Sequence, residues 1–186
     1  GVAHGLGFAA AIGLPYRRPF VKYTPTWPRS FMPQNQHMRE LVARMKLLPI
    51  PEIIEGKRLL FCEDSVVRGT QLKDTVRRLF DTGALEIHLR PACPPLLFAC
   101  PYLNFSRSKS ELDLIARRAI RELEGHDGEP PAVYLDQDSE AYARMVAKIG
   151  EMLGVTSIRY MRMDDMAEAI GLPADQLCTH CWNREG

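Results

Sequence analysis

Two adjacent carboxylates, Glu63 and Asp64, stand directly after a run of apolar residues at positions 59–62. A short turn of small and hydroxyl-bearing residues follows at 65–70, and an amphipathic segment opens after it at 71–81. A helix that begins at such a turn offers unpaired backbone N–H groups and a positive dipole end to a phosphate. The carboxylates can accept hydrogen bonds from sugar hydroxyls or hold Mg²⁺, directly or through water. The combination therefore indicates a site that holds a sugar phosphate.

A plainer interpretation of the same residues is structural. Residues 58–63 would then form a parallel strand in an α/β domain, and the acids at its end would only cap the next helix. The added turn at 65–70 favours the phosphate site over a simple cap.

Size and composition describe an ordinary globular protein. The chain has 186 residues, of which 46% are apolar and 25% charged, which suits one domain with a sizeable core. A net charge of +1 gives no argument for nucleic acid or an anionic membrane as a partner. No apolar run approaches the ~18 residues of a membrane span, and no basic leader opens the chain. Because the five cysteines include a CxxC pair and suggest no disulfide framework, we expect a cytoplasmic protein.

The elements that must position the acids are predicted to be a strand, a helix and a second strand. Residues 58–63 and 86–90 have the character of buried strands, and residues 71–81 between them have helical periodicity. Such alternation predicts a parallel sheet with right-handed crossovers. Ligands of such sheets bind at the carboxyl ends of the strands, which is where Glu63 and Asp64 fall.

The rest of the chain is predicted to be mixed helix and strand, with a proline-rich loop. Proline spacing predicts the irregular loop at 24–33, since proline excludes regular structure. The other predicted elements are helices at 2–13, 36–47, 109–124, 138–153 and 163–170, and strands at 20–22 and 157–161.

Residues 63–70 resemble the phosphoribosyl-pyrophosphate (PRPP) signature of type I phosphoribosyltransferases, and their ending is similar to that of the glutamine PRPP amidotransferase family. The resemblance implies an α/β type I phosphoribosyltransferase fold, with a central, mainly parallel sheet, helices on both faces and a C-terminal helical tail carrying the CxxC pair. It also implies a transferase core at 1–107, truncated at its start, and a C-terminal part at 108–186 that packs on the core.

The resemblance implies a reaction in which ammonia from glutamine displaces pyrophosphate from C1 of PRPP and gives phosphoribosylamine, the first step of purine synthesis. Such a reaction needs positioning and charge stabilisation more than a strong nucleophile. Glu63 and Asp64 would hold the ribose hydroxyls and orient Mg²⁺-bound PRPP. Lys22 and Arg29 would act in a loop that closes over the pyrophosphate. The 5′-phosphate would lie in a cradle formed by Ser65, Val66, Val67, Arg68, Gly69 and Thr70.

The cysteines allow more than one interpretation. Taken alone, the CxxC pair formed by Cys178 and Cys181 could be a redox pair, half a zinc site or chance. With Cys100, the pair resembles three of the four thiolates that hold a 4Fe–4S cluster in one branch of the family. Addition of Cys93 would give a Cys₄ set suited to zinc. Cys62 is expected in the core, and none of the five histidines shows catalytic or metal-binding spacing.

The resemblance also implies partners. The glutaminase domain of the family is not among these residues, and the family binds purine nucleotides in the PRPP pocket. We also expect a homo-oligomer. The loop departs from the family pattern, with Tyr23 and Thr24 after Lys22 and with Pro28 before Arg29. The alternative function, from a different class, is therefore a non-catalytic module that binds PRPP or purine nucleotides.

Overall fold

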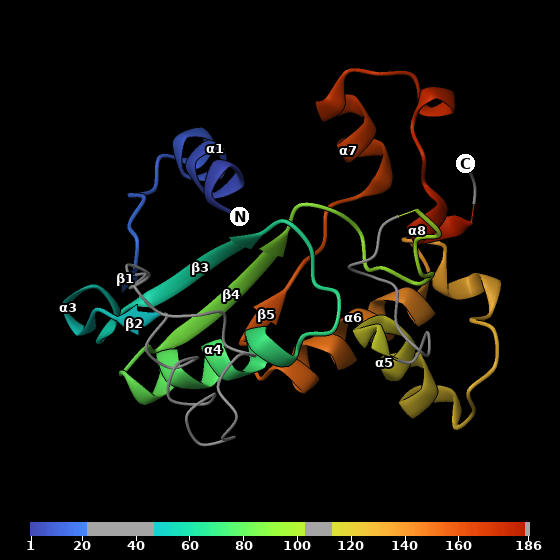
Figure 1. The fold of residues 1–186 in the computed structure, drawn as a ribbon. Helices are drawn as coiled ribbons and strands as arrows, with labels where there is room; N and C mark the ends of the chain where they lie inside the picture. The colour runs from blue at the N-terminus through green and yellow to red at the C-terminus, as the bar shows by residue number, and fades with distance from the viewer. Residues whose placement is uncertain (22–46, 103–112, 185–186) are drawn as a thin grey trace, which may run out of the picture.

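A computed structural model describes residues 1–21, 47–102 and 113–184 of the chain. Its main sheet has three parallel strands, β3 (Arg58–Glu63), β4 (Glu86–Pro91) and β5 (Ser157–Ile158), in the order β3-β4-β5 (Figure 1). The register places Leu60 opposite His88, and His88 opposite Ser157. The α/β class and the parallel sheet predicted from the sequence are confirmed.

Helices cover both faces of this sheet, as predicted (Figure 1). Helix α1 (Val2–Ile12) lies against β3 on one face. Helices α4 (Thr70–Asp81) and α6 (Glu140–Leu153) lie on the other face, where Ile87 and Leu89 of β4 are buried beneath them. The crossover from β3 through α4 to β4 thus has the arrangement that the apolar spacing indicated.

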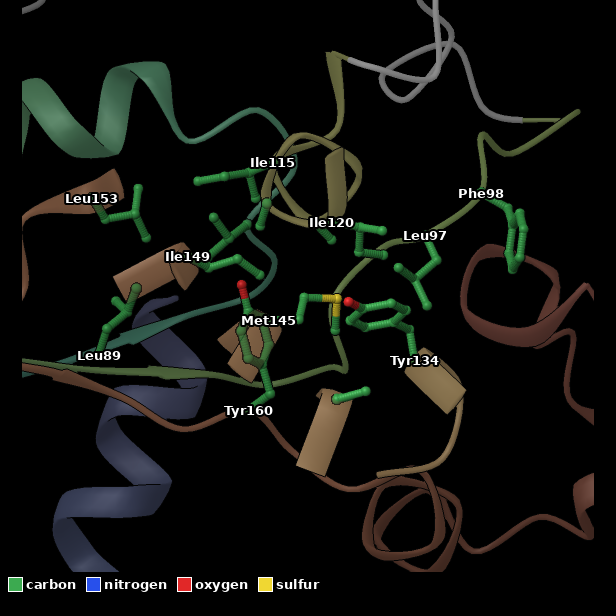
Figure 2. Packing of buried hydrophobic residues seen from close by; sticks show 14 residues of the cluster. Leu89, Leu97, Phe98, Ile115, Ile120, Tyr134, Met145, Ile149, Leu153 and Tyr160 are labelled. Carbon is green, nitrogen blue, oxygen red and sulfur yellow. The ribbon is translucent and has the colours of Figure 1, made fainter. Parts of the chain in front are cut away.

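The larger core cluster joins α6 to helix α5 (Ile115–Glu124) and to the sheet (Figure 2). Tyr134, Met145 and Ile149 in this cluster are fully shielded from solvent. Apolar burial of this kind contributes about 25 cal/mol per Å² to folding. A second, smaller cluster packs α4 against β4 through Val76, Leu79 and Ile87.

A two-stranded antiparallel sheet lies beside the main one. Strand β1 (Phe20–Val21) pairs with β2 (Leu48–Pro49), and the short helix α3 (Pro51–Ile54) follows. The sequence pattern predicted no element at 48–54, where the structure has these two short ones. Proline is tolerated at a sheet edge and favoured in the first turn of a helix, so Pro49 and Pro51 fit the elements that they occupy.

The C-terminal part is helical and docks on the irregular segment after β4. It consists of the 3₁₀ turns Ala132–Tyr134 (η2) and Ala174–Gln176 (η3) and the helices α7 (Met163–Ile170) and α8 (His180–Asn183). The carbonyl of Cys181 accepts hydrogen bonds from the amides of Leu97 at 2.9 Å and Phe98 at 3.1 Å. The indole Nε1 of Trp182 donates to the carbonyl of Pro94 at 3.1 Å.

Some expected boundaries are not tested or are shorter than expected. The division between residues 107 and 108 and most of the helix at 36–47 fall outside the described residues. Strand β5 ends at Ile158, although the amides of Arg159 and Met161 still donate to carbonyls of β4. Among the helices of the described ranges, none has the length and apolar character needed to span a bilayer.

Candidate functional site

The two acids lie at the carboxyl edge of the main sheet, as the sequence predicted. Glu63 is the last residue of β3 and is half-buried, whereas the side chain of Asp64 just beyond it is 69% exposed. The amide of Asp64 donates to Oε1 of Glu63 at 3.3 Å. One acid is therefore held against the strand end, while the other faces outward.

The two carboxyl groups titrate differently. Burial, and after it a side-chain hydrogen bond with Asp64, raises the pKa of Glu63 to about 6. The same hydrogen bond lowers the pKa of Asp64. At neutral pH the pair carries two negative charges side by side, an arrangement that a cation or a hydrogen-bond donor relieves.

The turn after the acids is fixed by the core beneath it. The side chain of Val66 is only 3% exposed, and the amide of Ile115 donates to the carbonyl of Val67 at 2.9 Å. The guanidinium of Arg118 donates to the carbonyl of Arg68. Carbonyls of the turn thus attach it to α5, while the amide of Ser65 is hydrogen-bonded to the carboxylate of Asp64.

The unused amides make the turn suitable for an anion. No backbone carbonyl of the described ranges accepts a hydrogen bond from the amides of Val67, Arg68 or Gly69. Gly69 is the N-cap of α4 and provides no side-chain cap, so the first turn of that helix is also open. Amides at a helix start bind phosphate through their N–H groups and the helix dipole.

Glycine is required at position 69 for two independent reasons. Its φ is 73°, in the left-handed region that favours glycine. A Cβ there would lie 2.6 Å from Cδ1 of Ile115 and 2.9 Å from Cδ2 of Leu153. The backbone therefore approaches the core more closely than any side chain would permit.

Side chains within the predicted cradle have other partners. Val66 packs in the core, and Arg68 forms an ion pair with Asp113 at 3.9 Å, with both side chains about half exposed. The Ser65 hydroxyl is half-buried, and Thr70, the first residue of α4, is exposed. Within the cradle predicted at 65–70, the groups best placed for an anion are therefore backbone amides rather than side chains.

A second helix start lies beside the acids, and the sequence assigned no site residue there. A Cβ on Gly1 would be 2.7 Å from the carbonyl of Cys62 and 3.3 Å from Oε1 of Glu63. The N-terminal end of α1 therefore sits at the tip of β3 (Figure 1). The small residues of 2–13 indicated a helix, but no sequence signal showed which strand it would meet.

The remaining predicted catalytic residues, Lys22 and Arg29, lie outside the described residues. So does the loop at 24–33 in which they were expected to act.

The cysteines predicted as iron–sulfur ligands are only partly brought together. Cys181 is hydrogen-bonded to Cys100, and Cys178 acts on it electrostatically. Burial and these neighbouring thiols raise the pKa of Cys181 to about 11. Across the three described stretches, no three His, Cys, Asp or Glu side chains are grouped closely enough to hold a metal ion. Cys100 and Cys181 thus provide two neighbouring thiols, and the two acids provide carboxylate oxygens, the donor types that iron–sulfur clusters and Mg²⁺ respectively take.

Cys62 is less buried than the predicted core residue, and Cys93, the fourth thiol of the possible zinc set, is also only partly buried. Cys62 is half-buried and faces α1, where a Cβ on Gly5 would lie 3.9 Å from its Cβ. Burial, and to a lesser degree the charges of Asp64 and Cys181, raises the pKa of Cys93 to about 11. Cys93 thus lies within electrostatic reach of both the acids and the C-terminal thiols.

The chain is similar to curated proteins over nearly its whole length. It is 31% identical over 183 residues to the amidophosphoribosyltransferase of Synechococcus elongatus, covering 98% of this chain and 31% of that protein. It is 33% identical over 181 residues to the amidophosphoribosyltransferase of Methanocaldococcus jannaschii, covering 97% of this chain and 32% of that protein. The chain therefore spans about a third of the length of these relatives. No family model matches.

Solved structures give the same result at the level of the fold. The glutamine PRPP amidotransferase of B. subtilis, complexed with ADP and GMP, matches with a TM-score of 0.68 and 27% identity. The match covers 95% of this chain and 34% of that one. A structure of the allosteric regulatory enzyme of purine biosynthesis matches with the same TM-score and identity, over 95% of this chain and 33% of that one.

Proposed function

The chain belongs, by homology over nearly its whole length, to the amidophosphoribosyltransferase family, and on this premise we propose that it is the phosphoribosyltransferase part of such an enzyme. Its ligand would be PRPP, bound at the carboxyl edge of the main sheet. The reaction would transfer ammonia, released from glutamine, to C1 of PRPP. Because the chain spans about a third of its relatives, glutamine hydrolysis is assigned to a part of the enzyme outside these residues.

The observation that carries the proposal is the pairing of an open turn with two acids. The amides of Val67, Arg68 and Gly69 donate to no backbone carbonyl in the described part of the chain, and they lead into the uncapped start of α4. Glu63 and Asp64 immediately precede that turn. A phosphate on the amides would leave the hydroxyls of a ribose within reach of the acids.

In the proposed reaction a C1–N bond forms as the C1–O bond to pyrophosphate breaks, and pyrophosphate leaves with the electron pair. The turn would fix the 5′-phosphate, and the acids would fix the ribose so that C1 faces the incoming ammonia. Lys22 and Arg29 would shield the pyrophosphate from water. Mg²⁺, when bound, would neutralise charge on the pyrophosphate.

We also propose that Cys100, Cys178 and Cys181 provide three thiolates to a structural 4Fe–4S cluster. The hydrogen bond between Cys100 and Cys181, and the electrostatic effect of Cys178 on Cys181, support this. Anaerobic incubation with iron and sulfide should load iron into the wild-type chain and into Cys62→Ser. Cys181→Ser should bind none, and equal loading of all the proteins would contradict the assignment.

The test of the transferase uses ammonia instead of glutamine as the nitrogen donor. Calorimetry would measure Mg²⁺–PRPP binding, and a coupled assay would measure phosphoribosylamine. We expect binding and turnover in the wild type and in Asp74→Asn, a control on the exposed face of α4, and loss of both in Asp64→Asn. PRPP binding without turnover in the wild type would contradict the enzyme and favour a nucleotide-binding module.

A further inference from the structure

Strand β4 has one polar face, which is unusual for a strand in the middle of a parallel sheet. Parallel sheets in α/β proteins are normally covered on both faces and read as continuous apolar runs. In β4 the side chains alternate, with Ile87 and Leu89 buried and Glu86, His88 and Arg90 half-buried on the opposite face. This second face of β4 therefore carries polar and charged side chains.

The register brings two arginines together on this face. His88 pairs with Ser157, so the residues two positions further along, Arg90 and Arg159, also share a face. The amide of Arg159 donates to the carbonyl of Leu89 at 3.1 Å, which keeps the two chains side by side beyond the end of β5. Neighbouring strands lie about 4.8 Å apart, so the two side chains start close together.

The two positive charges repel each other. The pKa of Arg90 is lowered, first by burial and then by the charge of Arg159. Leaving two cations close together is unfavourable unless an anion lies between them.

No carboxylate in the described residues compensates these charges. Neither Arg90 nor Arg159 forms an ion pair there, and Arg90 donates to the carbonyl of its own neighbour Leu89 at 2.8 Å. The carboxylate of Glu86, also on β4, forms a hydrogen bond with Nε2 of His88 at 2.8 Å. The other ring nitrogen of His88 forms a hydrogen bond with Oγ of Ser157 at 2.8 Å. Glu86, His88 and Ser157 are thus bonded to one another and not to the two arginines.

We propose that Arg90 and Arg159 form a binding site for an oxyanion, a phosphate or a carboxylate, on the face of the sheet opposite α4. Guanidinium groups present planar sets of N–H donors that match both kinds of oxyanion. Since Arg90 is paired in register with Cys62, the site lies one strand away from the acids Glu63 and Asp64. The inference does not depend on the proposed function, because it needs no ligand at the turn.

The experiment follows the Nε–Hε resonances of the arginines by NMR while inorganic phosphate is added to the 186-residue chain. The amides at 67–69 are followed in the same spectra, so the turn and the arginine site report separately. We expect saturable shifts at Arg90 and Arg159. Arg159→Gln, a change at an exposed position, should weaken phosphate binding at Arg90 about tenfold, since charge-assisted hydrogen bonds are lost.

The matched control is Arg77→Gln, at an exposed position of α4, which should leave the affinity unchanged. A titration with glutarate distinguishes the sources of the anion: saturation by phosphate alone indicates a phosphorylated ligand, and saturation by both indicates a carboxylate as well. Shifts that do not saturate, or that match those of Arg77, would overturn the proposal. Shifts confined to the amides at 67–69 would overturn it while leaving the proposed function intact.

Discussion

Gly69 and Ile115 lie so close that a Cβ on the glycine would be 2.6 Å from Cδ1 of the isoleucine. The amide of the same isoleucine donates to the carbonyl of Val67 at 2.9 Å. One residue at the start of α5 therefore fixes both the shape of the turn and its distance from the core. The turn that holds the proposed anion site is therefore built directly on the larger hydrophobic cluster.

Replacement of Gly69 by alanine should destabilise the protein through two effects. The left-handed backbone costs roughly 1–2 kcal/mol for a residue with a Cβ. Overpacking against Ile115 and Leu153 adds about 1–3 kcal/mol. Urea unfolding of Gly69→Ala measures the sum.

Gly125→Ala is the matched control, because Gly125 has a φ of 78° and a Cβ there would meet nothing within 4 Å. It should show the backbone cost alone. Equal losses of unfolding free energy in the two variants would show that a Cβ at position 69 causes no overpacking against the core.

Replacement of Asp64 by asparagine should change binding without changing stability. The side chain is 69% exposed, so the substitution removes the charge that the proposal assigns to Mg²⁺–PRPP binding but little packing. We expect the affinity for Mg²⁺–PRPP to fall at least tenfold, with an unfolding free energy within about 0.5 kcal/mol of wild type. An unfolded variant, or one with unchanged affinity, would show that the acid is structural.

Stability should depend on pH through Glu63. Because its pKa is raised from 4.5 to about 6, the folded chain keeps a proton in this interval that the unfolded chain has released. The proton therefore stabilises the folded state fully below about pH 4.5, and this contribution is lost as the pH rises through about 6. Glu63→Gln cannot titrate, so the wild type should lose stability relative to this variant between these pH values.

Urea unfolding of both proteins at several pH values measures the difference. A constant difference across the interval would mean that the carboxyl group titrates normally.

Replacement of Trp182 by phenylalanine should loosen the C-terminal helix. The variant lacks the indole N–H that donates to the carbonyl of Pro94. Loss of such a hydrogen bond lowers the unfolding free energy by about 1 kcal/mol. The amides of Leu97 and Phe98, which donate to the carbonyl of Cys181, should then exchange faster with deuterium. Amides within α6 are the internal control, and uniform acceleration there as well would indicate global rather than local loosening.

Much of the fold could be predicted because its central elements have strong periodicity. The apolar run before Glu63 and the helical spacing of Val76 and Leu79 specified the β3–α4–β4 unit. Phe80, the residue after Leu79 on the same helix, is nonetheless 36% exposed. Periodicity shows which side of a helix is apolar, but the packing partners decide how much of that side is covered.

Other features could not be predicted, because they depend on contacts between distant segments. Strands β1 and β2 contain two residues each, and their pairing joins positions 20 and 49. The alignment of Arg90 with Arg159 likewise depends on a register between strands far apart in the chain. The acids and the turn were found because they are contiguous, and the end of α1 beside them was missed because it is not.

The most direct measurement is a crystal structure of the chain with Mg²⁺ and PRPP. The account predicts a 5′-phosphate within hydrogen-bonding distance of the amides at 67–69, with the ribose hydroxyls on Glu63 and Asp64. A PRPP molecule bound elsewhere on the chain, with these amides turned toward other protein groups, would contradict it.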